Sequence, residues 1–321
     1  PRIAFFDWKN IFQGTVIPVG PSSVINAYYR PLLELLYRVE YVFFGLDPSG
    51  YHFLNIIFHV ANSFLVYCLV NVLVPGKKGS AFAAAVLFLL HPVQSEAAAC
   101  ISGISNLLFA FLVLASLCFY LRNSIISHVL SLLAFALALL AKEQAVVLPV
   151  LIVLLEMIYP PSTTRPMRPR AVRIGGYFVV LIIYFLARKI LLPEGAMPAI
   201  AFNYESLLRV FSIPRTVLMY LGIIFSPHDL HYYRSVDILR PNGVSIGVFL
   251  AAFVAVIWII RKAPKPHRRL LLLGAGWFGI TLLPVLNIVP LINEYSLILA
   301  AEHFLYLPLI GVLLFVLGLG D

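Results

Sequence analysis

The sequence predicts an all-α, polytopic membrane protein. Hydrophobic residues make up 61% of the 321 positions and charged residues 12%, and the mean hydropathy is +0.96. One soluble core cannot hold so much apolar surface, because too few polar side chains remain to cover it. The apolar residues also come in runs long enough to cross a bilayer, with short polar connectors between them.

Basic residues outnumber acidic ones, 23 against 14, for a formal net charge of +9. They lie in short connectors between apolar runs, as the positive-inside rule expects of a cytosolic membrane face. We therefore expect lipid as a partner and no nucleic acid. Cys68, Cys100 and Cys118 lie in or beside apolar runs without metal-site spacing, so we interpret them as small hydrophobic side chains.

Residues 1–50 are predicted to form an outer-face loop and an interfacial helix. The first 29 residues combine turn formers with aromatic side chains that suit a membrane interface. A helix is expected to begin after Arg30, because Pro31 suits a first turn and Glu34 stands four residues before Arg38. At about 16 residues, with three charges, it is too short and polar to cross a core of roughly 30 Å.

Residues 51–321 are predicted to form one transmembrane domain, which gives a bundle of about 9–10 spanning helices. The lengths of the apolar runs, and the polar and turn-forming residues that separate them, place the candidate spans at 51–74, 80–98, 103–121, 125–141, 144–159, 174–192, 243–260, 270–287 and 302–320. The apolar run 214–227 is expected to be re-entrant or to lie flat, since all basic connectors then share one face. The chain begins without Met and ends inside an apolar run, so we expect a fragment that lacks an N-terminal helix and a C-terminal part.

Under this topology most acids and histidines outside the connectors gather on one outer face. His91 and Glu96 close an apolar helix, and Pro92 bends the chain so that both can face one cavity. Ionisable residues at a membrane edge are paired, reach water or serve function. A helix end with satisfied polar groups is the alternative. No metal site is expected, because the sequence lacks a His-Glu-x-x-His helix.

Lys142 and Glu143 stand between two apolar helices, where burying either charge alone would cost several kcal/mol. We expect either that the two side chains form an ion pair with each other or that Lys142 binds an anion. Asn106, near the start of the next helix upstream, suits either helix capping or a sugar hydroxyl.

Two further segments carry polar groups toward the same face. The loop 229–240 contains His231 and Arg234 among groups that bind carbohydrates and phosphates, although a solvated loop is the alternative. Glu302, His303 and Tyr306 lie within one turn at the start of the last helix. Glu302 also complements a helix N-terminus, which leaves a structural role open.

Six motifs follow one another from residue 29 to residue 308. They are Tyr29-Arg30-Pro31-Leu32, Gly50-Tyr51-His52 with Asn55, His91-Pro92-Val93 with Glu96-Ala97, Ala141-Lys142-Glu143, Ser226-Pro227-His228-Asp229-Leu230, and Ala301-Glu302-His303-Phe304-Leu305-Tyr306-Leu307-Pro308. Each alone is weak. Together they resemble the membrane domain of the transmembrane-and-TPR-repeat O-mannosyltransferases and their bacterial and archaeal relatives.

The resemblance implies the C-type fold of membrane glycosyltransferases (GT-C), which use a lipid-phosphate sugar and act on the outer or lumenal face. It also implies a catalytic acid in the first outer loop, which would lie upstream of Pro1. Within this chain Glu96 and then Glu302 are the candidates for that role. The chain departs from the family pattern at three places. It has Gly103-Ile104-Ser105-Asn106 where relatives commonly carry Gly-Arg-x-Asp. It has His303 where relatives usually carry Arg, and Tyr233 where they usually carry Asp.

We therefore hypothesise an inverting transferase that moves a sugar, such as mannose, from a polyprenyl-phosphate donor to a hydroxyl of a protein or glycan. The donor's phosphate and sugar would lie against Arg30, His91, Lys142, Glu143, His231, Arg234, His303 and Tyr306. No cofactor is expected beyond this donor, and any need for a divalent metal stays open. The expected location is the plasma membrane of a bacterium or archaeon, or the endoplasmic reticulum of a eukaryote, with a non-cytosolic active face.

The alternative function is a transporter or flippase of lipid-linked or anionic substrates. Transporters often show repeated halves and broken helices near the middle of the membrane. Here no repeat stands out, and the polar groups cluster at helix ends on one face, which favours an interfacial site. A scaffold without chemistry would predict polar groups that merely pair with each other.

Overall fold

The computed structural model describes residues 15–19, 24–122, 124–159, 169–192, 204–228, 230, 234–236, 242–286 and 298–320. The helices are α2 (Pro31–Phe44), α3 (Pro48–Leu73), α4 (Lys78–Leu90), α5 (Ser95–Ala99), α6 (Ile104–Tyr120), α7 (Ile125–Ala141), α8 (Leu148–Ile158), α9 (Arg170–Leu191), α10 (Tyr204–Phe225), α11 (Gly243–Lys262), α12 (Lys265–Leu282) and α13 (Pro308–Leu319). Tight 3-10 turns are η1 (Pro92–Gln94), η2 (Ile101–Gly103), η3 (Glu143–Val147), η4 (Leu283–Leu286) and η5 (Glu302–Leu305).

The helical bundle confirms the predicted all-α membrane class. In the described part of the chain, helices α3, α6, α9, α10, α11 and α12 are long and apolar enough to cross a membrane. Helix α4 and residues 92–99 make a seventh span if the pair, bent by 52°, counts as one. Large apolar side chains such as Phe53, Leu133 and Trp258 are exposed on the bundle, as expected of a surface that faces lipid. The chain is therefore an integral membrane protein.

The predicted number of about 9–10 spans is larger than the six or seven that length and composition support among the described residues. Helices α7, α8 and α13 have 17, 11 and 12 residues, at or below the lower limit for crossing a bilayer. Turns η3 and η5 replace the first part of the spans expected at 144–159 and 302–320. A polar turn at a helix start shortens the helix without changing the apolar run from which the span was predicted.

The region before the bundle differs in part from its prediction. Helix α2 begins at Pro31 and ends at Phe44 as expected, and the Arg38–Glu34 ion pair measures 3.1 Å. Residues expected to form only a loop instead include strand β1 (Thr15–Val19) paired antiparallel with β2 (Val24–Tyr28). Their β-branched residues favour an extended chain. A second small sheet joins β3 (Arg234–Val236) to β4 (Ile298–Ala300).

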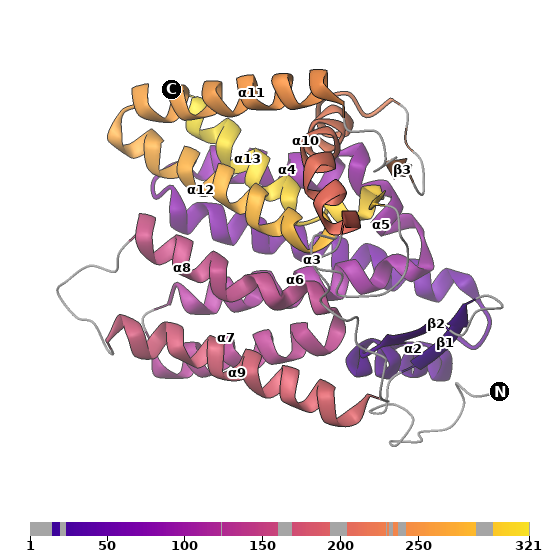
Figure 1. Ribbon diagram of the computed structural model, residues 1–321. Helices are drawn as coiled ribbons and strands as arrows, with labels where there is room; N and C mark the ends of the chain where they lie inside the picture. The colour runs from indigo at the N-terminus through magenta and orange to yellow at the C-terminus, as the bar shows by residue number, and fades with distance from the viewer. Residues whose placement is uncertain are drawn as a thin grey trace.

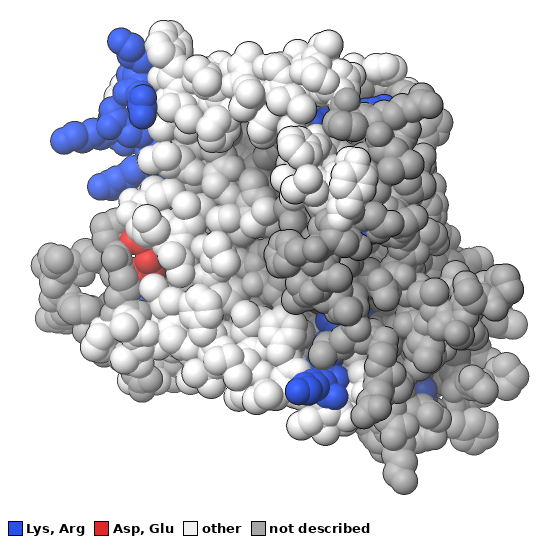
Figure 2. Space-filling view, viewed as in Figure 1, with Lys and Arg blue, Asp and Glu red and all other residues white. Residues whose placement is uncertain are grey.

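The basic connectors meet at one end of the bundle. The Arg173 guanidinium stacks 4.5 Å from the Tyr120 ring centre and lies 3.4 Å from Glu156, which brings the start of α9 to the ends of α6 and α8. The ring of His267 donates to the carbonyl of Gly318 at 3.2 Å, so the start of α12 meets the end of α13. Figure 2 shows Lys and Arg clustered where α11 and α12 join, on the left of the view.

Helix α10 corrects the expectation for residues 214–227. The segment is part of one continuous 22-residue helix that contains Pro214, so a re-entrant break is wrong. Its length and composition make it a candidate span. Figure 1 shows it running across the direction shared by α7, α9, α11 and α12, which agrees with the alternative that it lies flat over the helix ends.

Candidate functional site

The candidate site lies at the end of the bundle opposite the basic connectors. There α4 gives way to η1, α5 and η2 before α6 begins. Gly103 makes this tight path possible, because a Cβ at that position would stand 2.1 Å from the carbonyl oxygen of Ala97. The close approach places the first turn of α6, and with it Asn106, beside the turn that carries Glu96.

His91 holds the bend in place. The backbone N–H of Val93 donates to Nδ1 of His91 at 3.2 Å, so Nδ1 carries a lone pair. The Nε2–H then donates to the carbonyl of Ile224 at 3.1 Å and ties the bend to α10. Because both ring nitrogens have protein partners, His91 positions the backbone, and we do not assign it to a phosphate.

Glu96 and His303 join two segments 207 residues apart in the sequence. The Nδ1 atom of His303 lies 2.6 Å from Oε1 of Glu96, and the backbone N–H of His303 donates to Oε2 at 2.9 Å. One carboxylate thus fixes both the ring and the main chain of η5. The Glu96 side chain is 7% exposed and that of His303 is 15% exposed.

Lys142 and Glu143 follow α7 and have different partners. Nζ of Lys142 donates to Oδ1 of Asn106 at 2.5 Å and lies 5.8 Å from the ring centre of Phe304. Glu143 receives two bonds from Arg30, at 2.5 and 2.9 Å. The predicted mutual ion pair of the two neighbours is therefore replaced by an Arg30–Glu143 pair, which fastens the start of α2 to η3.

The Arg30–Glu143 pair also sets the protonation of the carboxyl. Burial by itself would raise the pKa of Glu143, but the charge and hydrogen bonds of Arg30, with help from Lys142, lower it to about 2. Glu143 is therefore a carboxylate at any physiological pH. Its strong pairing makes it a poor proton acceptor and a good anchor for Arg30.

The hydroxyl of Tyr306 points into the interior of the bundle. Nε2 of His59 lies 3.0 Å from the carbonyl of Leu89 and must donate there, which leaves Nδ1 as an acceptor for the Tyr306 hydroxyl at 2.8 Å. The amide of Asn62 donates to the same hydroxyl at 3.0 Å. The hydroxyl is thus used in the core, while other atoms of Tyr306 line the cavity described next.

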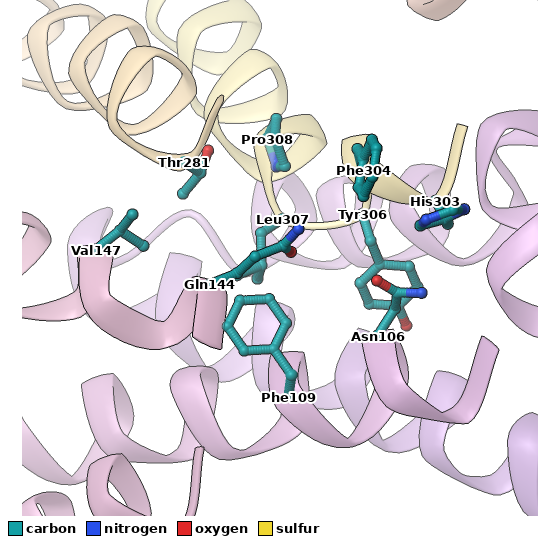
Figure 3. A pocket seen from close by; sticks show the side chains of 10 residues that line it. All are labelled: Asn106, Phe109, Gln144, Val147, Thr281, His303, Phe304, Tyr306, Leu307 and Pro308. Carbon is teal, nitrogen blue, oxygen red and sulfur yellow. The ribbon is translucent and has the colours of Figure 1, made fainter. Parts of the chain in front are cut away.

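A small cavity lies between these segments. Its lining residues are Asn106, Phe109, Gln144, Val147, Thr281, His303, Phe304, Tyr306, Leu307 and Pro308. Figure 3 shows Asn106 and Gln144 on the side opposite Phe304 and Pro308. The centre of a water molecule can move within roughly 10 Å³ of this cavity. The cavity therefore has room for about one water molecule.

The predicted site residues Arg234 and Glu302 form a pair with each other. Arg234 on β3 lies 4.0 Å from Oε1 of Glu302, and both side chains are largely buried. This ion pair gives Glu302 a partner beside the site. His231 and Tyr233 lie outside the described residues. In the described part of the chain no group of three or more His, Cys, Asp and Glu could hold a metal ion.

The structure therefore brings Arg30, Glu96, Lys142, Glu143 and His303 near one another, and the roles expected of them stay predictions. The charges of Glu96, Lys142 and Arg30 all act on the His303 ring. Sequence reasoning missed Gln144 and Thr281. Gln144 could have been found from its place next to Glu143, whereas Thr281 is a single hydroxyl in an apolar helix and gives no sequence signal.

The chain is similar to curated proteins named protein O-mannosyl-transferases. Tmtc1 of Drosophila melanogaster is 31% identical over 301 residues, which is 80% of this chain and 34% of the relative. TMTC3 of Homo sapiens is 33% identical over 167 residues, or 50% of this chain and 18% of the relative. Human TMTC4 is 31% identical over 163 residues, or 43% of this chain and 22% of the relative.

The chain spans about a third of the length of the first of these relatives and less of the other two. No family model and no solved structure matches it. The similarity to Tmtc1 covers most of the sequence. The curated homologues of this chain are O-mannosyl-transferases of the transmembrane-and-TPR-repeat type, and the resemblance predicted from the motifs is confirmed.

Proposed function

We propose that this chain is the membrane domain of a glycosyltransferase that takes a sugar, such as mannose, from a lipid-phosphate donor. One observation carries the proposal: Arg30, Glu96, Lys142, Glu143 and His303 come from distant parts of the chain and meet beside one cavity. The names of the homologues support a sugar-transfer reaction. The acceptor would be a hydroxyl of a protein or glycan.

Lys142 and Arg30 are the proposed electrophilic groups. When the bond from the sugar to the phosphate breaks, negative charge grows on the leaving phosphate. Preorganised cations in a site that excludes water stabilise such charge strongly. Lys142 is 4% exposed and already aimed by Asn106. Arg30 is held by Glu143 at 2.5 Å, so little reorganisation is needed at the moment of reaction.

A transporter fits the polar groups less well. A transport path needs polar groups that run through the bundle, whereas the buried polar atoms of His59 and Tyr306 bond to each other in its interior. At the far end Tyr120, Glu156 and Arg173 form another mutual cluster. Protein groups thus occupy these polar atoms, and the cluster around Lys142 stays at one end.

The cavity has room for about one water molecule, so donor binding is expected to widen it. Phe304 and Gln144 line it from two different segments, and a movement of either side chain would open space next to Lys142. Since α2 begins beside the site, the lipid chain of the donor would lie between helices at this end of the bundle. We place the reaction on the non-cytosolic face, opposite the basic connectors.

The test measures transfer by the full-length protein in lipid nanodiscs. Radiolabelled polyprenyl-phosphate mannose and a Ser/Thr-containing acceptor protein are supplied, and transfer is compared for wild type, Lys142→Ala and Lys142→Arg. We expect Lys142→Ala to lower kcat by about 10²-fold or more, and Lys142→Arg to retain more activity. Lys265→Ala is the control, because this lysine is exposed at the opposite end.

Two results would contradict the proposal. If the wild-type protein shows no donor-dependent transfer, the hypothesis that it is a glycosyltransferase is rejected. If Lys142→Ala transfers sugar at an unchanged rate, Lys142 does not bind the donor phosphate. Movement of intact donor across the membrane of sealed vesicles, without transfer, would favour a flippase.

A further inference from the structure

The polar groups that line the cavity are mostly uncharged. They include the side-chain amides of Asn106 and Gln144 and the hydroxyl of Thr281. Among the described residues that line it there is no Lys, Arg, Asp or Glu. Uncharged donors and acceptors suit a neutral hydroxyl group, whereas a phosphate is held by cations such as Lys142 and Arg30. The cavity therefore fits a part of the substrate other than its phosphate.

Asn106 brings hydrogen-bond donors to this cavity. Its Oδ1 accepts from Nζ of Lys142 at 2.5 Å. Because an ammonium group only donates, the oxygen of the amide must face Lys142, and the N–H₂ group is the other end of the amide. In the described part of the chain the N–H₂ group has no hydrogen-bond acceptor. Asn106 is also not the N-cap of α6, which is Gly103, so its N–H₂ group is available to a ligand.

Gln144 and Thr281 add acceptors. The half-buried side chain of Gln144 makes no hydrogen bond within the described residues, so its carbonyl oxygen can accept and its N–H₂ group can donate. Oγ1 of Thr281 donates to the carbonyl of Trp277 at 2.8 Å, which uses its hydrogen and leaves the oxygen as an acceptor. In Figure 3 the amide end of Gln144 has Thr281 to one side and Asn106 to the other. A hydroxyl group, which both donates and accepts, can bond to this set of groups.

The size of the cavity also matches one hydroxyl group. Its open volume of roughly 10 Å³ holds about one water molecule, and a hydroxyl oxygen has nearly the same size and bonding pattern as that water. The other walls are largely apolar and include Phe109, Val147 and Phe304. Ligand sites combine apolar walls with a few polar groups that fix orientation. A sugar, whose hydroxyl groups stand on a skeleton of C–H bonds, matches this combination.

We propose that this cavity is a subsite for one hydroxyl group of the donor sugar, and that Asn106, Gln144 and Thr281 determine which sugar is transferred. The inference rests on the proposed glycosyl transfer and adds the residues that select the sugar. Because Oδ1 of Asn106 contacts Lys142, the hydroxyl subsite and the proposed phosphate site share one side chain. The hydroxyl takes the space already present, and the sugar ring takes the space that a movement of Phe304 adds.

The subsite selects through the groups that it would leave unpaired. A sugar that lacks the hydroxyl displaces the water but returns no hydrogen bond, so buried amide and hydroxyl groups lose their partners. Sites built to bond a substrate hydroxyl reject the analogue without it far more strongly than an apolar pocket rejects a smaller substrate. The free energy of discrimination therefore belongs to a single position of the sugar.

The test compares donors and variants together, with the full-length protein in lipid nanodiscs. The donors are polyprenyl-phosphate mannose and analogues that each lack one hydroxyl group of the sugar. In wild type we expect one analogue to have a kcat/KM about 10- to 100-fold below that of the mannose donor. Gln144→Leu keeps a similar volume without the amide, and Thr281→Val keeps the shape without the hydroxyl. Each should lower the mannose-to-analogue ratio of kcat/KM by about fivefold or more, because the missing contact no longer distinguishes the two donors.

Gln94→Leu is the matched control. Gln94 on η1 is also a glutamine at this end of the bundle and is 1% exposed, but it is not one of the residues that line the cavity. The substitution removes the same amide group. A general disturbance of the site lowers the rates for all donors alike, so we expect the mannose-to-analogue ratio of Gln94→Leu to stay at the wild-type value. A fall in this ratio equal to that in Gln144→Leu would show that the effect does not come from the cavity.

The outcomes separate the two proposals. If wild type transfers no mannose, the proposed function is rejected and the hydroxyl subsite with it. If wild type is active and uses every analogue as well as mannose, the cavity holds only water, and the subsite is overturned while glycosyl transfer stands. Wild-type ratios for every analogue in Gln144→Leu and Thr281→Val would overturn it as well. If both variants fail to fold, the comparison of donors with wild type alone decides.

Discussion

Glu40 on α2 shows how burial of a single carboxyl makes stability depend on pH. Its side chain is 2% exposed, and neither oxygen has a hydrogen-bond partner among the described residues. Burial raises the pKa of Glu40 to about 7 from 4.5. Between these pH values the folded chain holds a proton that the unfolded chain releases. The stabilisation is complete below about pH 4.5 and is lost as the pH rises through about 7.

Glu40→Gln removes this loss because glutamine cannot ionise. We expect the variant to match wild type near pH 5 and to be more stable at pH 8, by on the order of 1 kcal/mol. Thermal unfolding of the purified protein in detergent at the two pH values measures the difference. Glu34→Gln on the same helix is the control, since Glu34 is more exposed and pairs with Arg38 at 3.1 Å. Parallel pH curves for wild type and Glu40→Gln would refute the explanation.

Helices α12 and α13 form a tight contact that supports the site. The indole N–H of Trp277 donates at 2.9 Å to the carbonyl of Leu307, the residue just before α13. At the centre of the contact, a Cβ on Gly274 would stand 2.5 Å from the backbone nitrogen of Phe315 and 2.6 Å from the carbonyl oxygen of Gly311. Backbone atoms cannot move aside as a flexible side chain does. Small residues at such contacts let membrane helices approach closely.

Gly274→Ala should therefore push α13 away from α12 and lower stability by about 1–3 kcal/mol. Because α13 continues from η5, transfer activity should fall with it. Gly279→Ala on the same helix is a matched control: nothing lies within 4 Å of its Cβ, and alanine favours a helix over glycine by about 1 kcal/mol. The unfolding temperatures of both variants in one detergent test this, and equal temperatures would contradict the packing argument.

Local sequence signals predicted α2 and the adjacent helices α6 and α7 close to their observed bounds, because Pro31, Gly103 and the apolar runs act within a few residues. Local signals did not predict strands β1 and β2, because the pairing of a strand depends on its partner. They also did not predict the length of α10, which begins well before the apolar run between Pro214 and Pro227. The pairing of Glu96 with His303 could be expected only as a shared face. A contact across 207 residues is decided by how helices pack, which spacing does not reveal.

At the scale of the whole molecule, one end of the bundle carries a cluster of exposed basic side chains and the other end carries the candidate site. Exposed Lys and Arg surround the junction of α11 and α12 in Figure 2, whereas Asn55 near the start of α3 donates to the carbonyl of Cys100 at 2.7 Å, at the site end. The positive-inside rule makes the basic end cytosolic. A lipid-phosphate donor on the outer leaflet would then reach Lys142, and acceptors would come from the non-cytosolic compartment.

This orientation is tested with single cysteines in a background where Cys68, Cys100 and Cys118 are replaced by Ala. Ser49→Cys, in the exposed first turn of α3, and Lys265→Cys, at the exposed start of α12, are treated with a membrane-impermeant maleimide in sealed membranes of known orientation. We expect labelling of Ser49→Cys from the non-cytosolic side, and of Lys265→Cys from that side only after permeabilisation. The reverse pattern would put the Lys142 cavity in the cytosol, where an outer-leaflet donor could not reach it.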